Sequence, residues 1–203
     1  MSNDAMPGRQ SVRERMLAIR RAIPPPNRIA GAQSLARRLL ALPLAPTSGF
    51  VAGYWATNGE IALHAWQVGL PGGCHYCLPV LHEDGRLRFA QWRPGAPLVP
   101  NRFGIPEPDV GPDQLLEPEA IAMVVVPLVG FDRVGHRLGM GGGWYDRSFA
   151  FRRTGPAPPW LVGAAFDEQQ VVSLDAAPWD VPMDAVCTPL QSHHYRHCNR
   201  QDP

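Results

Sequence analysis

Residues 137–147 read RLGMGGGWYDR, which places four glycines within five residues, directly before two aromatic residues and an Asp-Arg pair. A β-branched stretch precedes them, so we expect a strand, a glycine turn and then a helix. Uncovered backbone N–H groups beside the positive end of a helix attract anions, most often phosphate. Glycine suits such a site because a side chain would hold the anion away from the amides. A glycine cluster is also typical of an ordinary tight turn, so the pattern alone leaves both interpretations open.

Neither common phosphate-binding motif fits this segment. A P-loop needs a lysine, and all 19 residues counted as Lys or Arg are Arg. A dinucleotide fingerprint on Gly139 and Gly141 needs a small residue where Trp144 stands. The absence of lysine also excludes mechanisms that pass through a lysine Schiff base.

Asp146 falls in the first turn of the expected helix, where its carboxylate would repel a phosphate bound at the glycines. A divalent cation between them would turn this repulsion into attraction, and proteins usually hold Mg²⁺ by one or two carboxylates together with phosphate oxygens. Arg137 and Arg147 are candidates to clamp phosphate oxygens. The alternatives are an acid that only favours the helix dipole and arginines that are only solvated. Chemically, the residues indicate a Mg-nucleotide site on an unfamiliar loop.

The elements that position this loop follow from the periodicity of apolar residues. Ser11 to Arg21 predicts a helix that ends at Pro24–Pro26, and Asn27 is expected to cap a second helix. The remaining helices are predicted at 59–70 and 144–153, and the strands at 50–55, 75–81, 86–92, 120–127 and 160–166.

Strands that alternate with helices predict an α/β protein. We expect a three-layer α/β/α fold with a mainly parallel central sheet and the N-terminal helices packed on it, because 120–127 has the continuous apolar character of a covered central strand. The length predicts one domain over residues 1–203, with flexible tails. Ligands of such sheets bind at the carboxyl ends of the strands, where 127–143 would lie.

The composition limits the classes of molecule that we expect the protein to bind. A formal net charge of +1 gives no electrostatic case for nucleic acid or an anionic membrane. The longest apolar run, 120–131, is too short to span a bilayer, and the first residues lack the apolar core of a secretion signal. We expect a cytoplasmic monomer with reduced thiols that acts on small molecules.

The segment VVVPLVGFDRVGHRLGMGGGWYDR resembles the signature of the 5-formyltetrahydrofolate cyclo-ligase family, also called 5,10-methenyltetrahydrofolate synthetases. That signature runs approximately P-x-x-A-F-D-x-x-G-x-R-L-G-x-G-x-G-Y-Y-D-R. The segments NGEIALHAW, RPGAPLVPNRFGIPEP, LVGAAFDEQQVVSL and PWDVPMDAVCT resemble further parts of the family, so the likeness extends from about Arg9 to Thr188. Gly130, Met140 and Trp144 are mild departures that bear on the fit of the folate.

The resemblance implies that ATP and 5-formyltetrahydrofolate give 5,10-methenyltetrahydrofolate, ADP and phosphate, with Mg²⁺. By family analogy the formyl oxygen attacks the γ-phosphate, and the anilino nitrogen then closes the ring. Such a reaction needs positioning and charge neutralisation rather than a protein nucleophile.

The resemblance also implies roles for individual residues. Asp146 and Asp180 would hold Mg²⁺, Arg137 and Asp146 would be catalytic, and Arg9, where the family has Lys, would bind ATP. A loop Asp such as Asp180 is otherwise typical of a turn cap. The implied ATP-binding residues are Arg9, Arg13, Arg137, Leu138, Gly139, Met140, Gly141, Gly142, Gly143, Trp144 and Tyr145.

For the folate, the resemblance places Glu60 as the carboxylate that accepts from the pterin N–H groups. Trp55 and Phe103 would pack on its rings, and Met140 and Trp144 would also face it. From the sequence alone, Glu60 is typical of a helix start, and Trp55 and Phe103 are typical of core residues.

Two competing functions remain open. Cys74-x-x-Cys77 has zinc-ligand spacing, and the tail offers histidines and a cysteine at His193, His194, His197 and Cys198. No second pair at a finger-like interval supports a zinc module. A related α/β phosphate-binding enzyme is the other alternative, but it would not need Asp146, Glu60 and the Phe-Gly-Ile-x-Glu-Pro segment together.

Overall fold

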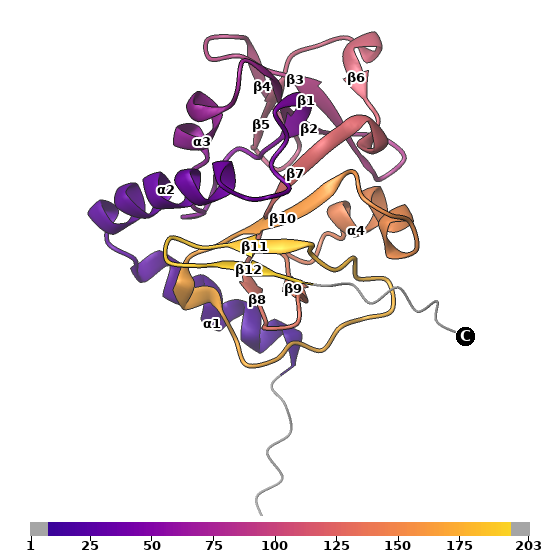
Figure 1. Ribbon diagram of the computed structural model, residues 1–203. Helices are drawn as coiled ribbons and strands as arrows, with labels where there is room; N and C mark the ends of the chain where they lie inside the picture. Colours follow the sequence, from indigo (N-terminus) through magenta and orange to yellow (C-terminus); the bar gives the residue numbers. More distant parts are fainter. Residues whose placement is uncertain (1–7, 196–203) are drawn as a thin grey trace, which may run out of the picture.

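The structure of the protein, a computed structural model that describes residues 8–195, is organised by an eight-stranded sheet (Figure 1). From one edge to the other the strands are β12 (Ser192–His194), β11 (Ala185–Cys187), β10 (Trp160–Ala164), β7 (Ile121–Pro127), β1 (Ser48–Ala52), β2 (Gly73–Leu81), β3 (Leu87–Gln91) and β6 (Leu115–Leu116). The five strands from β11 to β2 pair in parallel, and β12, β3 and β6 add antiparallel edges. The predicted mainly parallel sheet is confirmed.

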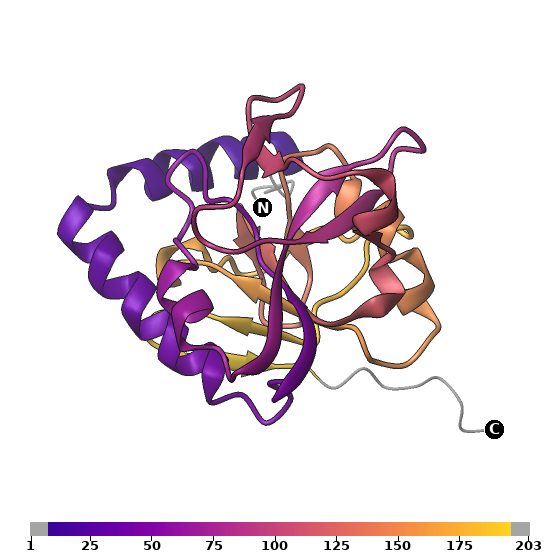
Figure 2. The same cartoon turned by 90° about the horizontal axis from the view of Figure 1, so that it is seen from above.

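Helices cover both faces of this sheet (Figure 2). One face carries α2 (Pro25–Leu40) and α3 (His64–Gly69), which bury Leu35, Leu39 and Trp66 in the first core cluster. The opposite face carries α4 (Trp144–Ser148) and a 3₁₀ turn, Ala150–Arg153, next to the second cluster. This arrangement confirms the three-layer α/β/α fold.

Helix α1 (Arg9–Ala22) lies against a two-stranded ribbon of β8 (Gly130–Phe131) and β9 (Arg137–Leu138) (Figure 1). Val12 and Met16 are buried there beside Val129 and Leu138. A second ribbon pairs β4 (Leu98–Pro100) with β5 (Pro106–Pro108). Three further 3₁₀ turns span Pro112–Gln114, Pro118–Ala120 and Asp167–Gln169.

The helix predicted at 59–70 is shorter than expected and begins only at His64. Asn58 and Gly59 have φ values of 49° and 78°, which a right-handed helix does not allow. Residues 57–60 form a turn instead, in which the Glu60 N–H donates to the carbonyl of Thr57 at 2.9 Å.

Two other helix boundaries also differ from the prediction. The second helix begins at Pro25, with Pro24 as N-cap, so Asn27 is not its cap. Proline is tolerated there because the first helical N–H groups have no intrahelical partner. The helix predicted at 144–153 breaks at Phe149, whose φ of −111° separates α4 from the 3₁₀ turn.

Among residues 8–195, no helix has both the length and the apolar character that crossing a membrane requires.

Candidate active site

The two predicted halves of the site follow neighbouring strands. β1 and β7 pair in parallel, with Val51 opposite Met123 and Ala52 opposite Val124. Their carboxyl ends therefore open onto the same edge of the sheet, which is where open α/β sheets bind ligands. The chain after β1 carries Trp55 and Glu60, and the chain after β7 leads into the glycine turn.

The β8–β9 ribbon that presents the glycine turn is organised by Asp132. This carboxylate is 1% exposed and accepts backbone N–H groups of Val134 and His136, both at 3.0 Å, and of Leu174 at 3.1 Å. Its other contact is the His136 ring, at 2.9 Å. A carboxylate with this many donors fixes the conformation of the loop between β8 and β9. The backbone of Arg137, the first residue of β9, is therefore held in place.

Arg137 and Asp146 meet across the glycine turn. Arg137 Nη2 donates to Asp146 Oδ1 at 2.5 Å, and the Val181 N–H donates to the same oxygen at 3.0 Å. Burial lowers the pKa of Arg137, while the charges of Asp146 and Asp180 act to raise it. Two carboxylates therefore surround one buried guanidinium at the base of the turn.

Asp180 and Arg9 form a second ion pair next to the first. Arg9 Nη1 donates to Asp180 Oδ2 at 2.6 Å and to the carbonyl of Asp175 at 2.9 Å. The same Asp180 oxygen accepts the Ala177 N–H at 2.9 Å. Asp180 thus makes the turn-capping contact expected of a loop Asp and also pairs with a cation from α1.

Helix α1 contacts the glycine turn directly through Arg13. Its Nε donates to the carbonyl of Gly139 at 2.9 Å. A Cβ built on Gly141 would lie 3.6 Å from Arg13 Nη2, and Gly141 has a φ of 97°. Gly143 is the N-cap of α4, with a φ of 65°. The positive φ values at Gly141 and Gly143 favour glycine at these positions of the turn. The arginine that contacts the turn from α1 is Arg13.

Two features of the turn correct the sequence-based interpretation. α4 spans only five residues, so few peptide dipoles add up at its start, and the amides and arginines have to provide the attraction for an anion. Arg147 already donates through Nε to the carbonyl of Gly85 at 2.8 Å and through Nη1 to that of Gly142 at 2.9 Å, so two of its three guanidinium nitrogens are engaged by the backbone. Leu138 is fully buried, and its carbonyl accepts the Val129 N–H at 2.8 Å.

Two arginines lie over the Trp144 ring at the start of α4. The guanidinium carbons of Arg102 and Arg147 are both 5.1 Å from its ring, and the Phe103 ring lies 6.5 Å away, edge to face. Met140 is 56% exposed. The side chains of the β4–β5 ribbon therefore reach the glycine turn.

Trp55 and Phe103 are not core residues. They are 38% and 59% exposed, and Trp55 packs edge to face on Trp92 at 5.8 Å. Exposed aromatic rings beside a loop at a strand end are available to pack on a planar ligand, which the alternative interpretation as core would not allow.

Glu60 lies in the turn before α3, so it is not the helix-start Glu that its position suggested. Its Oε2 accepts the Thr57 N–H at 2.9 Å, and its Oε1 lies 3.8 Å from Arg20 Nη1. Burial raises the pKa of Glu60, and hydrogen bonds from Thr57 and the charge of Arg20 oppose this rise. Burial also raises the pKa values of Tyr54 and Tyr145, each with a contribution from the charge of Glu60.

Sequence analysis missed the roles of Arg20 and Arg102 in this region. Arg20 continues the buried spacing of Val12 and Met16 on α1, and an arginine on an apolar stripe is the signal that could have revealed it. Arg102 precedes Phe103, and only the packing of the ribbon onto Trp144 identifies it.

The structure does not support the alternative of a zinc site at Cys74 and Cys77. Cys74 and Cys77 lie three residues apart on β2, so their side chains point to opposite faces of the sheet. Cys74 packs against the first core cluster and Cys77 belongs to the second. Within residues 8–195 no three His, Cys, Asp or Glu residues gather as a metal site. His197 and Cys198 lie outside the described residues.

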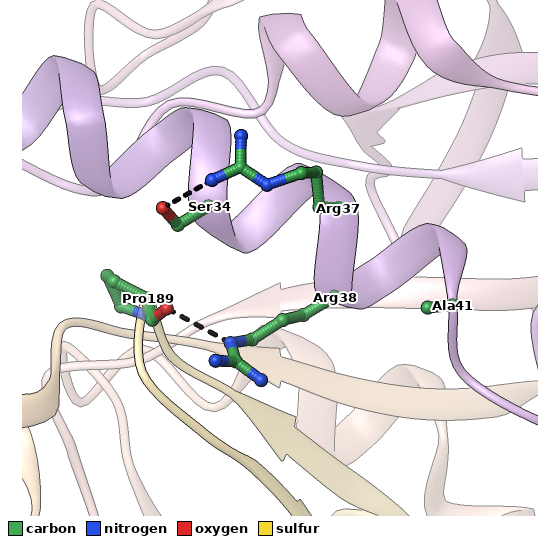
Figure 3. Close-up of a pocket in the computed structure, with 5 residues that line it drawn as sticks. All are labelled: Ser34, Arg37, Arg38, Ala41 and Pro189. Atoms are coloured by element: carbon green, nitrogen blue, oxygen red, sulfur yellow. Dashed lines mark hydrogen bonds between the residues drawn. The ribbon is translucent and has the colours of Figure 1, made fainter.

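Two surface hollows are lined by residues outside the glycine turn. One of 260 Å³ lies between α2 and Pro189, where Arg38 donates to the Pro189 carbonyl at 3.0 Å and Arg37 donates to Ser34 at 3.0 Å (Figure 3). A second, of 330 Å³, is lined by residues that include Trp92, the neighbour of Trp55. The candidate site is instead defined by side chains that converge from α1, the turn after β1 and the glycine turn.

Comparison with known proteins supports one family. The model of the 5-formyltetrahydrofolate cyclo-ligase family matches residues 5–189. The 5-formyltetrahydrofolate cyclo-ligase of Escherichia coli K12 is 35% identical over 177 residues, which cover 84% of this chain and 94% of the relative. The enzyme of the same name from Haemophilus influenzae is 34% identical, with 86% and 94% covered.

Solved structures agree with this assignment. The 5,10-methenyltetrahydrofolate synthetase of Aquifex aeolicus superposes with a TM-score of 0.77 at 26% identity, covering 96% of this chain and 99% of that one. The synthetase of Mycoplasma pneumoniae, at 23% identity and a TM-score of 0.66, covers 89% and 98% and shows the same fold. The chain therefore belongs to the 5-formyltetrahydrofolate cyclo-ligase family and is an enzyme of that kind.

Proposed function

We propose that the enzyme cyclises 5-formyltetrahydrofolate to 5,10-methenyltetrahydrofolate at the expense of ATP, with Mg²⁺. The formyl oxygen attacks the γ-phosphorus, and the bond from that phosphorus to the bridging oxygen breaks to release ADP. The anilino nitrogen then attacks the formyl carbon, loses its proton to solvent, and inorganic phosphate departs with the former formyl oxygen. Both steps need aligned reactants and neutralised charge rather than a protein nucleophile.

The observation that carries this proposal is the contact between α1 and the glycine turn. Arg13 donates to the Gly139 carbonyl at 2.9 Å, and the buried Arg137 lies at the base of the same turn. We assign the ATP phosphates to the backbone of 138–143 and to Arg9, Arg13 and Arg137. Met140, Trp144 and Tyr145 complete the assigned ATP-binding set. Arginine forks suit phosphate oxygens because they donate two parallel hydrogen bonds.

Asp146 and Asp180 fit a Mg²⁺ site in their donor chemistry. Both are carboxylates near one buried guanidinium, and such a pair, completed by phosphate oxygens and water, is a usual Mg²⁺ environment. When bound, the ion would supply positive charge to the phosphate oxygens. Each carboxylate already has an arginine partner, so Arg137 and Arg9 would have to share these oxygens with the ion or turn toward the phosphates.

We assign the folate to the chain after β1. Glu60 would accept the two pterin N–H groups, and Trp55, Phe103, Met140 and Trp144 would pack on its rings. The exposure of Trp55 and Phe103 supports this assignment, because a buried ring would be unavailable to a ligand.

The direct test mixes the purified chain with 5-formyltetrahydrofolate, ATP and Mg²⁺ and records the absorbance of the methenyl product together with ADP release. Equal amounts of both products are expected, and no product without ATP. The Escherichia coli relative serves as a positive control. If the relative turns over and this chain does not, the proposed activity is wrong.

The remaining expectations belong to the same proposal. We propose a single-domain cytoplasmic monomer that binds small molecules and neither nucleic acid nor membrane. Light scattering coupled to gel filtration tests the monomer, and a mass of twice the chain or more would contradict it.

A further inference from the structure

Arg20 is an arginine that α1 buries almost completely. It is 1% exposed, and its guanidinium donates to the carbonyl of Asn58 through Nε and to that of Leu128 through Nη1, both at 3.2 Å. Its Nη1 lies 3.8 Å from Glu60 Oε1. Its Nη2 is buried without a hydrogen-bond partner among residues 8–195. A buried cation with an unused donor is costly, so a role is expected to maintain it.

The three contacts of Arg20 join the parts of the proposed site. α1 carries Arg9 and Arg13, the Asn58 carbonyl belongs to the turn that ends in Glu60, and Leu128 directly follows β7. One side chain thus links the helix assigned to ATP, the turn assigned to folate and the chain that leads to the glycine turn.

The two oxygens of the Glu60 carboxylate have different neighbours. Thr57 occupies Oε2 through its backbone N–H at 2.9 Å, whereas Oε1 faces Arg20. The other titratable groups around the pair are Tyr54 and Tyr145, both neutral because burial raises their pKa values, together with Arg21 and Arg28, which act on Arg20. Arg20 is the cation that acts on Glu60.

We propose that Arg20 is a positioning residue for the folate, which holds the Glu60 carboxylate as a two-oxygen acceptor toward the pterin N–H groups. This inference rests on the proposed function, since it assumes that Glu60 binds the pterin. The chemistry is specific. An ionised carboxylate offers an acceptor to each of two N–H donors, whereas a protonated one turns an O–H toward one of them and loses that hydrogen bond. Without Arg20, Glu60 would lose both its orientation and its compensating charge.

The experiment measures KM for 5-formyltetrahydrofolate, KM for ATP and kcat across the acid and neutral pH range. The variants are Arg20→Gln, Arg20→Lys, Glu60→Gln and the Arg20→Gln, Glu60→Gln double variant. Arg15→Gln is the matched control, because Arg15 is an exposed arginine on the same helix. Circular dichroism and thermal unfolding establish that each variant is folded.

For Arg20→Gln we expect KM for the folate to rise about tenfold near neutral pH and further as the pH falls, with KM for ATP within about twofold. Arg20→Lys, which keeps the charge, is expected to fall between wild type and Arg20→Gln, and it carries the test if Arg20→Gln does not fold. In the Glu60→Gln background the Arg20 substitution is expected to add less than about twofold, because coupled residues are not additive.

An equal rise in both KM values, or an Arg20 effect that is undiminished in the Glu60→Gln background, would overturn the inference and leave Arg20 as a structural link only. An inactive wild-type enzyme would instead contradict the proposed function. A normal KM for the folate in Glu60→Gln would contradict the assignment of Glu60, and with it the role of Arg20.

Discussion

Arg137 and Asp146 form an ion pair across the glycine turn, with 2.5 Å between Nη2 and Oδ1. Arg137 is 7% exposed and its Nε has no partner among the described residues, so most of its charge compensation comes from this carboxylate. The pair links the strand β9 before the turn to the helix α4 after it. In the proposed function the same two charges face the phosphates and Mg²⁺, so the structural and the catalytic roles can be separated by the choice of substitution.

Asp146→Asn should separate these roles. The amide keeps the size of the side chain and can still accept the Val181 N–H, so we expect the folded state to persist while kcat/KM falls at least about 100-fold, or about 2.7 kcal/mol of transition-state stabilisation. Asp146→Ala removes the hydrogen-bonded carboxylate partner of the buried Arg137 and should in addition lose about 3–5 kcal/mol of stability. Steady-state kinetics and denaturant unfolding measure the two effects.

Asp113→Asn is the matched control. Asp113 is an exposed acid in the 3₁₀ turn Pro112–Gln114 and is not part of the proposed site. It is expected to behave as wild type in both measurements. Turnover of Asp146→Asn at the wild-type rate would show that the phosphates and the metal are placed wrongly.

Mg²⁺ dependence provides an independent test of the two carboxylates. Chelation with EDTA should abolish product formation, and added Mg²⁺ should restore it. Asp180→Asn removes one charged oxygen donor, so we expect a higher Mg²⁺ concentration for half-maximal activity, by about tenfold, at an unchanged KM for the folate. Wild-type Mg²⁺ titration curves for both Asp180→Asn and Asp146→Asn would remove these residues from the metal site.

The Arg9 position tests whether charge or fork geometry matters at the start of α1. Arg9 Nη1 contacts both Asp180 Oδ2 and the Asp175 carbonyl, two contacts that an ammonium can also make. Arg9→Lys, which introduces the residue typical of the family, should change KM for ATP by less than about threefold, whereas Arg9→Ala should raise it about tenfold. Arg15→Ala is the control for charge loss on this helix. Equal losses in Arg9→Lys and Arg9→Ala would show that the guanidinium fork is required.

The local order of strand, glycine turn and helix was predictable because apolar periodicity and glycine act over short distances. What escaped prediction depends on partners distant in sequence. Arg147 was only a candidate to bind phosphate, and its Nε donates to the carbonyl of Gly85, whereas Arg20 donates to carbonyls at positions 58 and 128. The turn before α3 was missed because the helix-like apolar spacing of 59–70 was given more weight than the Asn58-Gly59 dipeptide, which is typical of turns with positive φ.

The buried environment of Glu60 predicts opposite pH trends for activity and stability. Because burial raises its pKa above the ordinary value, the carboxylate becomes protonated at a higher pH than an exposed Glu. KM for the folate should therefore rise as the pH falls through this raised pKa. KM for ATP should show no such rise. A raised folded-state pKa contributes stability that is present at low pH and lost as the pH rises through it. Glu60→Gln should remove both trends. If KM for the folate still rises at low pH in that variant, another group is responsible for the rise.

The buried thiols should be chemically silent in the native enzyme. Burial raises the pKa of Cys77 to about 12 and that of Cys187 to about 11, so at pH 8 both are almost entirely protonated as well as inaccessible. Cys74 is partly exposed, although burial raises its pKa too, and its Sγ donates to the Pro46 carbonyl at 3.4 Å. Iodoacetamide followed by peptide mass spectrometry should modify Cys74 before Cys77 and Cys187, and all three at similar rates in guanidinium. Rapid native alkylation of Cys77 would mean that β2 opens far more often than a strand in the middle of a covered sheet should.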